Sequence, residues 1–354
     1  MKNTVLLAFA LALPACSHTT SLAPGGRVPG HTIGATAGWR ALPGAPTIAG
    51  KQDDVFFTDA STGWSVNGLG RIYHTTDGGQ TWTKQLDKPG TYFRAIAFVD
   101  RLHGFASNIG TDYYPNVTDE HPLYSTVDGG VTWQPVTAIT GPMPKGICNL
   151  DVVDAQHLVG AGRIGGPSFF IRSSDGGATW TSTDLSAQLP MLVDAHFTSP
   201  TDGVLIGGSD VTDTSQCTVL HTSDGGQTFT KVFTAHASGT VCWKLSFPSA
   251  QVGYASVLPL GSATSSFLKT VDGGATWSEK PFVADTYGAL GIGFADETTG
   301  WIAGEAKDKP AYRTNDGGAT WIADASLGPY INRFRFVGKV GYAIGSTIYK
   351  LVLP

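Results

Sequence analysis

Short apolar segments recur along the chain, and none keeps the period of 3.6 residues that marks an amphipathic helix. Each segment has the form apolar, any residue, then usually Phe, followed by a polar turn and commonly by Gly and an aromatic residue. Alternation with a period of two predicts pairs of short strands joined by turns. The seven segments are VFFTDASTGW, IAFVDRLHGF, LDVVDAQHLV, AHFTSPTDGV, LSFPSAQVGY, IGFADETTGW and FRFVGKVGY.

A second motif follows six of these segments. It reads TTDGGQTW at residues 75–82 and returns as TVDGGVTW, SSDGGATW, TSDGGQTF, TVDGGATW and TNDGGATW. Successive copies are 44 to 51 residues apart, a period typical of propeller or solenoid repeats. Each repeat therefore predicts four strands, with this motif at the turn between the third and the fourth.

The residues of this motif suit a turn better than a catalytic or metal site. Glycine supplies a positive φ, aspartate can bond the amides of its own turn, and tryptophan can pack back onto the strands. A Ca²⁺ loop is the alternative, but it uses several carboxylates at alternate positions. We interpret as structural the aspartates Asp77, Asp128, Asp175, Asp224, Asp272 and Asp316, and we expect no metal and no cofactor.

The two ends of the chain complete one repeat. The last repeat stops after STIYKLVLP, its third strand, whereas AGWRALP at residues 37–43 resembles the fourth strand TWTKQL. Joining the ends closes a ring and removes an exposed sheet edge. The sequence therefore predicts an all-β domain over residues 37–354, a seven-bladed β-propeller of four-stranded blades closed by an N-terminal strand.

Composition narrows the partners and the compartment. The net charge is −5 and there is no basic block, so nothing indicates a nucleic-acid partner. Residues 1–15 have one charge, Lys2, and the apolar run VLLAFALALP, which is typical of an export signal too short to span a bilayer. Residues 16–36 are rich in Ser, Thr, Gly and Pro and predict a flexible tether.

Leu13, Pro14 and Ala15 before Cys16 resemble the lipobox of bacterial lipoproteins. The resemblance implies acylation of Cys16 and, with Ser17 next, a lipid anchor in the outer membrane facing the periplasm. Cleavage by ordinary signal peptidase is the alternative.

Three other cysteines, Cys148, Cys217 and Cys242, would then lie in an oxidising compartment. An odd number allows at most one internal pair. Cys217 precedes a third strand of one blade and Cys242 begins the first strand of the next, on the same face, so we prefer this pair.

The first strand of each propeller blade lines the centre of the ring. Positions equivalent to Phe57 and Val55 are apolar in all seven repeats, so the alternate positions face the channel. Charges of both signs meet there, at one mouth of the channel. The candidate binding residues are Arg94, Asn149, Asp151, Asp194, His196, Lys244, Arg333 and Arg335.

Two interpretations of these residues stay open. They can pair with one another inside a water-filled channel. Alternatively, Arg94, Lys244, Arg333 and Arg335 can anchor a carboxylate such as a peptide C-terminus. In the second case they are surface charges that contribute little to stability. His196 has no Ser or Cys partner in the sequence that would make it a catalytic base.

The longest loop, SNIGTDYYPNVTDEHP at residues 107–122, places Tyr113 and Tyr114 among acidic residues. Long loops on one face of a repeat array are typical of a binding face. A tolerated insertion is the alternative.

The repeated motif resembles the Asp-box, or bacterial neuraminidase repeat, S/T-x-D-x-G-x-T-W/F. With seven blades and the pattern of residues 63–82, the chain most resembles the photosystem II stability and assembly factors and their bacterial relatives, over residues 37–354. This resemblance implies a non-catalytic protein that binds a protein or peptide client and assists the assembly or stability of an envelope complex. Arg94, Arg333 and Arg335 would match the family's arginine-rich patch, although Asp54, Asp151 and Asp194 dilute it.

A glycan-binding or sialidase-like glycoside hydrolase propeller is the alternative function. Sialidases carry an Arg-Ile-Pro motif, of which WRALP at residues 39–43 is the nearest approach, and they have six blades. Glycoside hydrolysis uses two carboxylates at a defined separation, and no such pair stands out in the sequence.

Overall fold

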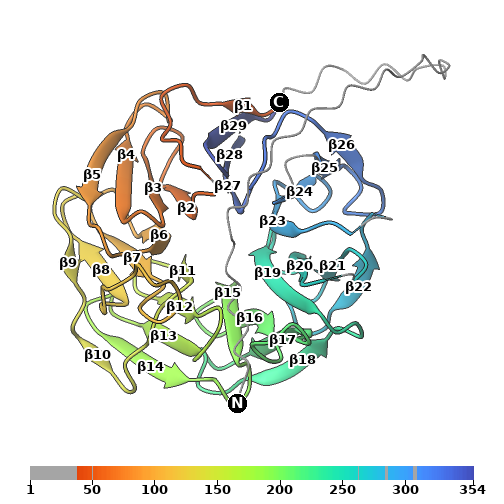
Figure 1. Ribbon diagram of the computed structural model, residues 1–354, viewed down its shortest axis with the longest axis horizontal. Coiled ribbons are helices and arrows are strands. Elements are labelled where there is room, and N and C mark those ends of the chain that lie inside the picture. The colour runs from red at the N-terminus through yellow and green to blue at the C-terminus, as the bar shows by residue number, and fades with distance from the viewer. Residues whose placement is uncertain (1–37, 50, 262, 284–285, 306–308) are drawn as a thin grey trace.

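The computed structural model describes residues 38–354, except for residue 50, residue 262, residues 284–285 and residues 306–308. Within this part the protein is all-β, with 29 strands in seven sheets arranged around a common centre (Figure 1). The predicted seven-bladed propeller is confirmed. The predicted signal peptide 1–15, the tether 16–36 with Cys16, and Ala37 lie outside the described residues. Among the described residues no helix is long and apolar enough to cross a bilayer.

In each blade four strands pair antiparallel, and the first of them is the innermost (Figure 1). Blade one contains β2 (Asp54–Phe57), β3 (Gly63–Asn67), β4 (Arg71–Thr75) and β5 (Thr83–Asp87). Blade two contains β6 (Phe93–Phe98), β7 (Gly104–Asn108), β8 (Leu123–Thr126) and β9 (Gln134–Pro135). Blade three contains β11 (Asn149–Val152), β12 (Leu158–Gly162), β13 (Phe169–Ser173) and β14 (Trp180–Asp184).

The other blades follow the same order. Blade four contains β15 (Met191–Phe197), β16 (Gly203–Gly208), β17 (Cys217–Thr222) and β18 (Thr230–Thr234). Blade five contains β19 (Thr240–Ser246), β20 (Gly253–Pro259), β21 (Ser266–Thr270) and β22 (Ser278–Pro281). Blade six contains β23 (Ala289–Phe294), β24 (Gly300–Gly304), β25 (Ala311–Thr314) and β26 (Ile322–Asp324). Blade seven contains β27 (Arg333–Val337), β28 (Val340–Ile344), β29 (Ile348–Val352) and β1 (Arg40–Ala41).

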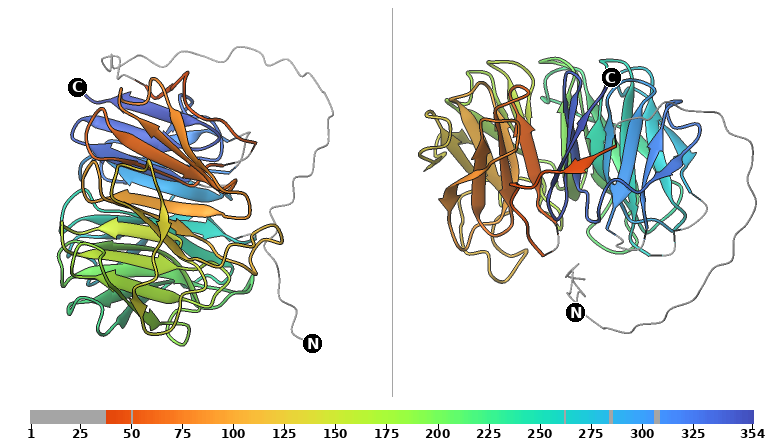
Figure 2. Two further views of the ribbon diagram at one scale, coloured as in Figure 1. Left: turned by 90° about the vertical axis from the view of Figure 1, so that its left-hand side faces the viewer. Right: turned by 90° about the horizontal axis from the view of Figure 1, so that it is seen from above.

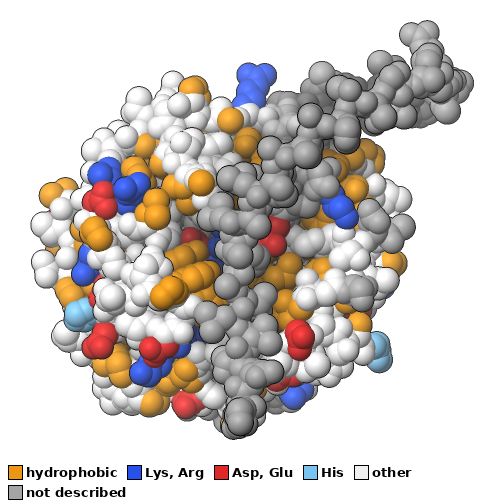
Figure 3. All heavy atoms as spheres, viewed as in Figure 1, with side chains coloured by type: hydrophobic (Ala, Val, Ile, Leu, Met, Phe, Trp, Pro, Cys, Tyr) orange, Lys and Arg blue, Asp and Glu red, His pale blue; other side chains and the backbone are white. Residues whose placement is uncertain are grey.

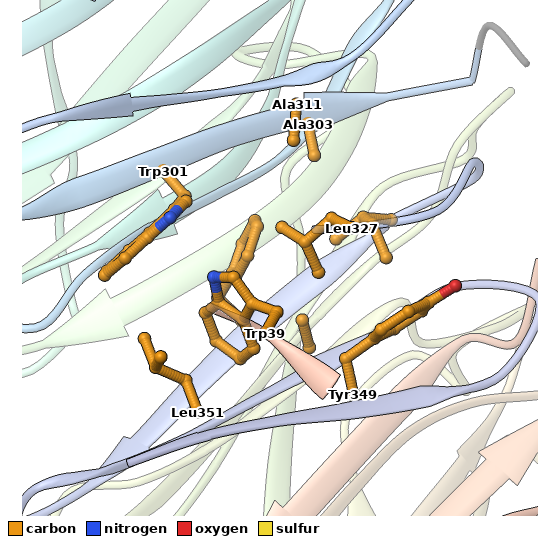
Figure 4. Packing of buried hydrophobic residues seen from close by; sticks show 10 residues of the cluster. Trp39, Trp301, Ala303, Ala311, Leu327, Tyr349 and Leu351 are labelled. Atoms are coloured by element: carbon orange, nitrogen blue, oxygen red, sulfur yellow. The ribbon is translucent and has the colours of Figure 1, made fainter. Parts of the chain in front are cut away.

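The predicted closure of the ring is confirmed by the pairing of β1 with β29. The two strands are antiparallel, with Arg40 opposite Lys350. Trp39, just before β1, is 3% exposed, and its ring centroid lies 5.4 Å from that of Trp301. Figure 4 shows this indole between Trp301 and the β29 residue Leu351. Burial of a large aromatic ring thus supplements the few hydrogen bonds of a two-residue strand.

Blade three departs from the predicted four strands. An extra short strand, β10 (Ile139–Thr140), runs parallel to β14 and makes the sheet five-stranded. It comes from the connection between blades two and three. This strand could not be predicted from the sequence, because two residues are too few to show a period.

The repeated motif forms the same turn in all six copies. In the first copy Thr75 Oγ1 donates to Asp77 Oδ1 (2.8 Å) and accepts from Gly79 N (2.9 Å). The Asp77 carboxylate accepts the Thr81 amide and hydroxyl, at 2.9 and 2.6 Å. Gly78 and Gly79 have φ of 71° and 88°, conformations that require glycine here. The aspartates therefore close the turns between third and fourth strands, as the sequence predicts.

Neighbouring blades are joined further out by aromatic rings. At three junctions the ring that follows the glycine of the second strand lies flat on the Phe of the next blade's innermost strand. The centroids are 3.5 Å apart for Trp64 on Phe98, for Tyr254 on Phe294 and for Tyr342 on Phe57. We call this position between two blades a ring slot. Stacked aromatic pairs contribute more than their area burial alone.

Asp-box carboxylates make the fold sensitive to acid. The hydrogen bonds from Thr81 lower the pKa of Asp77 from 3.8 to about 2. Because the folded pKa is lower than the unfolded one, this stabilisation is present above pH of about 4 and is lost as the pH falls to about 2. The other five aspartates also have a pKa of about 2.

We therefore expect Asp77→Ala to lower the melting temperature near pH 7 by about 2 to 4 °C, since the turn loses its acceptor. The difference from the parent should shrink as the pH falls from about 4 to about 2.5. Asp213→Ala, at an exposed loop position of blade four, is the control and should melt like the parent. A difference that is constant across this pH range would contradict the assignment.

Candidate functional site

Side chains from opposite blades meet at the centre of the ring and close it. Arg333 on β27 lies 3.2 Å from the Asp194 carboxylate of blade four and 3.1 Å from that of Asp54 in blade one. Lys244 Nζ is 3.9 Å from the same Asp194 oxygen. The Asp194 and Lys244 side chains are each 1% exposed, and that of Arg333 is 5% exposed. These residues form a buried ion network, which agrees with the interpretation that they pair with one another; the alternative, in which Lys244 and Arg333 are surface charges, is wrong.

The carboxylates of the innermost strands also bind the main chain of the next blade. Asp54 Oδ2 accepts the amide of Ile96 at 3.3 Å, across blades one and two. Asp151 Oδ2 accepts the amide of Phe197 at 2.9 Å, across blades three and four. Asp194 Oδ2 accepts the amide of Leu245 at 2.9 Å, across blades four and five. Their first role is therefore to join blades, because each satisfies a main-chain donor that strand pairing leaves over.

Charges in the network hold one another in the ionised state. Burial alone would raise the pKa of Asp194, but the charges of Arg333 and Lys244 hold it below the usual value. Asp194 and Asp54 likewise outweigh burial and raise the pKa of Arg333. Burial, with the nearby charge of Arg333, lowers the pKa of Lys244 far below its usual value. Arg333 is thus the main cation that balances the buried carboxylates.

The predicted residues fall into three groups. Asn149 belongs to the buried network, since its Nδ2 donates to Asp194 Oδ1 at 2.5 Å. Asp151, His196 and Arg335 are partly exposed: His196 Nδ1 lies 3.1 Å from Asp151, and Arg335 donates to Asp54 at 3.3 Å. Arg94 forms the third group. It lies four residues before the reference phenylalanine of its blade, and the same position is occupied by Asp53 in blade one and by Trp243 in blade five.

A β-bulge in β6 brings Arg94 together with Asp53 and Trp243. Phe93 pairs with Asn108 and Ala95 with Ser107, so Arg94 is the extra residue of the strand. Arg94 Nη1 bonds Asp53, and the guanidinium lies 5.7 Å from the ring of Trp243. Among the described residues the buried Nε and Nη2 atoms of Arg94 have no hydrogen-bond partner. They are donors that a ligand oxygen would satisfy.

Aromatic side chains surround this arginine. Tyr92 and Tyr114 stack in parallel with centroids 5.0 Å apart, and Tyr113 meets Tyr114 edge-on at 4.6 Å. We define the tyrosine pocket as Lys51, Tyr92, Arg94, Ile109, Tyr113, Tyr114, Ile164 and Trp243. The space enclosed between these side chains is about 10 Å³, so a ligand would lie across the rings rather than enter a deep cavity.

Hydrogen bonds hold the long loop over the pocket. Arg163 of blade three is 4% exposed and donates to the carbonyl oxygens of Ile109 and Thr111 at the start of the loop. At its end, Asp119 accepts from Thr91 and Tyr124 at 2.5 and 2.6 Å. The loop projects from the face that Figure 1 turns to the viewer, as the left panel of Figure 2 shows. Hydrophobic side chains gather around the centre of this face (Figure 3).

Sequence reasoning singled out Arg94, Tyr113 and Tyr114, and the structure brings them together. It missed Tyr92 and Trp243. The signal for Trp243 was present, because it occupies the same position of its repeat as Arg94, four residues before the reference Phe. A strict period of two assigns that position to the apolar face, and only the bulges in β6 and β19 turn it toward the centre.

The structure contains a disulfide between Cys217 and Cys242, the pair preferred from the sequence, with Cα atoms 4.6 Å apart. It links β17 of blade four to β19 of blade five. Cys148 is free and buried. In the described part of the chain no group of three or more His, Cys, Asp or Glu side chains is placed to hold a metal ion.

Comparison with known proteins supports this architecture. A BNR/Asp-box repeat matches residues 73–84. The chain therefore contains an Asp-box repeat within a β-propeller fold. No curated protein sequence matches it. Among solved structures it resembles YCF48 bound to D1 peptide, with 19% identity, 89% of this chain and 97% of that chain covered, and a TM-score of 0.65.

Two further structures are similar. YCF48 from Cyanidioschyzon merolae is 17% identical, with 89% of this chain and 99% of that chain covered and a TM-score of 0.67. The GH74 xyloglucanase from Xanthomonas campestris is 15% identical over 89% of this chain but only 53% of that chain, with a TM-score of 0.63. At these identities the similarity establishes the fold alone.

Burial of the ion network changes what a substitution at Arg333 should do. Arg333→Glu leaves Asp54 and Asp194 without their main cation and adds a third buried carboxylate. We expect it to lower the free energy of unfolding by at least about 3 to 5 kcal/mol, measured by urea denaturation. Arg71→Glu, at a half-exposed pair with Asp87, is the matched control and should cost less than about 1 kcal/mol. Equal stability of the two variants would contradict a buried network.

Proposed function

We propose that this protein is a non-catalytic propeller that binds a peptide segment of a protein client across the tyrosine pocket. The observation that carries the proposal is Arg94, a buried guanidinium with two unpartnered nitrogens beneath a group of tyrosines. Asp53 outweighs burial and raises the pKa of Arg94, so it stays cationic. Rings and a fixed cation suit a peptide carbonyl or carboxylate next to apolar side chains.

Similarity to a propeller with a bound peptide is consistent with this proposal. The structure named YCF48 bound to D1 peptide shares the fold over nearly its whole length. Assistance in assembling or stabilising an envelope complex is the wider role we propose. The buried network argues against the channel itself as the site, because its carboxylates already bind cations and main-chain amides.

Glycan binding or cleavage is the second candidate, favoured by the similarity to a GH74 xyloglucanase. A general acid in such enzymes has a raised pKa. The pKa values of Asp151 and Asp194 are instead lowered, because nearby cations and hydrogen bonds outweigh burial. A panel of aryl glycosides and sialosides separates the candidates, since turnover above the blank would favour the hydrolase.

Capture of peptides tests the main proposal. We expect the purified parent to retain members of a random peptide library, displayed with free and with amidated C-termini. Tyr114→Ala should reduce retention at least about tenfold while melting within a few degrees of the parent, because this ring is partly exposed. Tyr73→Ala, at a partly buried position of β4 outside the pocket, is the control. Retention unchanged by Tyr114→Ala would contradict the site.

Attachment to the envelope is proposed from the N-terminal sequence, in which Cys16 follows Leu-Pro-Ala. Cys16→Ala should abolish labelling by a palmitate analogue and move the protein from the membrane fraction to the soluble fraction. Two acyl chains or more are needed for stable anchoring, so loss of the acylated cysteine removes the anchor. Labelling that persists in the variant would contradict lipidation at Cys16.

A further inference from the structure

The ring slots provide an internal standard for the surface between blades. In the slots between blades five and six and between blades seven and one, a tyrosine hydroxyl donates to a turn carbonyl of the next blade. Tyr254 donates to Glu297 O at 2.8 Å, and Tyr342 donates to Ala60 O at 3.1 Å. Lys269 and Lys350, on the third strands of these blades, cover the two rings. Each donates to the carbonyl oxygen of the first glycine of the next Asp-box, at 3.0 Å in both cases.

Between blades three and four the slot has lost its ring. Val159 occupies the position of Tyr254 and Tyr342. The cation of the slot is still present. Arg172 Nη1 donates to the carbonyl oxygen of Gly225, the first glycine of the next Asp-box, at 2.7 Å. The inner Phe197 remains as well, and Pro200 stands where Ala60 and Glu297 accept the hydroxyls.

A pocket of about 460 Å³ opens at this junction. Val159 and Phe197 belong to its floor, and Arg172, Pro200 and Gly225 line its walls. Thr181 and Gln227 form part of a polar rim. The pocket lies at the turns between first and second strands and at the Asp-box turns, on the opposite face from the tyrosine pocket.

A missing ring does not by itself open a pocket. Blade four also has a valine, Val204, at this position. There the imidazole of His196 stacks on the inner Phe247, with centroids 4.9 Å apart, and the Val204 methyl packs on Gly274. At the junction between blades three and four no described ring lies as close to the inner phenylalanine: Phe170 of the third strand stacks on Phe197 at 5.7 Å, and it does not line the pocket.

We propose that the pocket between blades three and four binds a phenol ring that a partner protein presents as a tyrosine side chain. The ring rests on Val159 beneath the Arg172 guanidinium, as Tyr342 rests beneath Lys350. Its hydroxyl donates to the carbonyl oxygen of Pro200. The polar rim bonds the main chain that carries the tyrosine. This site is independent of the tyrosine pocket and of its proposed peptide ligand.

Two capped amino acids serve as probes, N-acetyl-tyrosine amide and N-acetyl-phenylalanine amide. Ligand-observed NMR with the whole protein should give binding of both, with the tyrosine probe roughly fivefold tighter because only it has a hydroxyl to donate. Equal affinity of the two probes, or no binding of either, would overturn the proposal.

Variants then place the probe in the slot. Val159→Tyr restores the ring from within the chain, so it should raise the melting temperature and abolish binding. Val204→Tyr is the matched control: its slot is already occupied by His196, so it should lower the melting temperature and leave binding unchanged. Thr181→Trp closes the pocket from its exposed rim without altering the core, and it should also abolish binding.

Each result decides the matter. A Val159→Tyr variant that is less stable than the parent would show that the slot does not fit a ring. Tyrosine-probe binding that survives both Val159→Tyr and Thr181→Trp would show that the probe binds elsewhere. Either outcome overturns the proposal, and neither bears on peptide capture at the tyrosine pocket.

Discussion

Hydrogen-bonded strand ladders run only within each blade, so the closed ring depends on the contacts that neighbouring blades make with one another. The protein meets this constraint in two concentric layers. Near the centre, carboxylates of one blade accept main-chain amides of the next and share buried cations. Further out, aromatic rings of one blade stack on the inner phenylalanines of the next and bond its turns. The Asp-boxes supply carbonyl groups to the lysines that cover two of these rings and to the indole of Trp64.

This use of charge decides where recognition can occur. A buried ion pair contributes little net stability compared with apolar packing, but removing one partner is costly. Arg333, which contacts Asp54 of blade one and Asp194 of blade four, is therefore committed to holding the ring together. Arg94 has Asp53 as its anion and two nitrogens to spare, so it is the cation best placed to meet a ligand. Both arginines are buried, so the difference between them lies in their partners, not in burial or residue type.

The fold could be predicted from the sequence because the pattern of one blade recurs seven times along the chain. The repeat length, the Asp-box and the split last blade each depend on local pattern, and local pattern was sufficient for topology and ring closure. The site could be predicted only in part. Period-two alternation placed Asp194 and Arg333 at the centre, but it carries no information on burial, so it could not decide between a paired network and surface charges that bind a ligand. Period-two alternation would assign Trp243 to the apolar face, because a β-bulge changes the face without leaving a mark in the pattern.

Repeats also make departures from the pattern informative. A single valine on a strand predicts nothing, but Val159 stands where five of the other six blades place an aromatic ring, and it leaves Arg172 and Phe197 in the positions of a slot. Where the ring is absent at Val204, the protein has filled the space with His196. The same comparison identifies Arg94, the one arginine at a position where other blades place Trp243, Val193 and Leu290. In a closed array of similar blades, the junction and the position that break the rule are therefore where binding chemistry should be sought first, because the common residues are needed for closure.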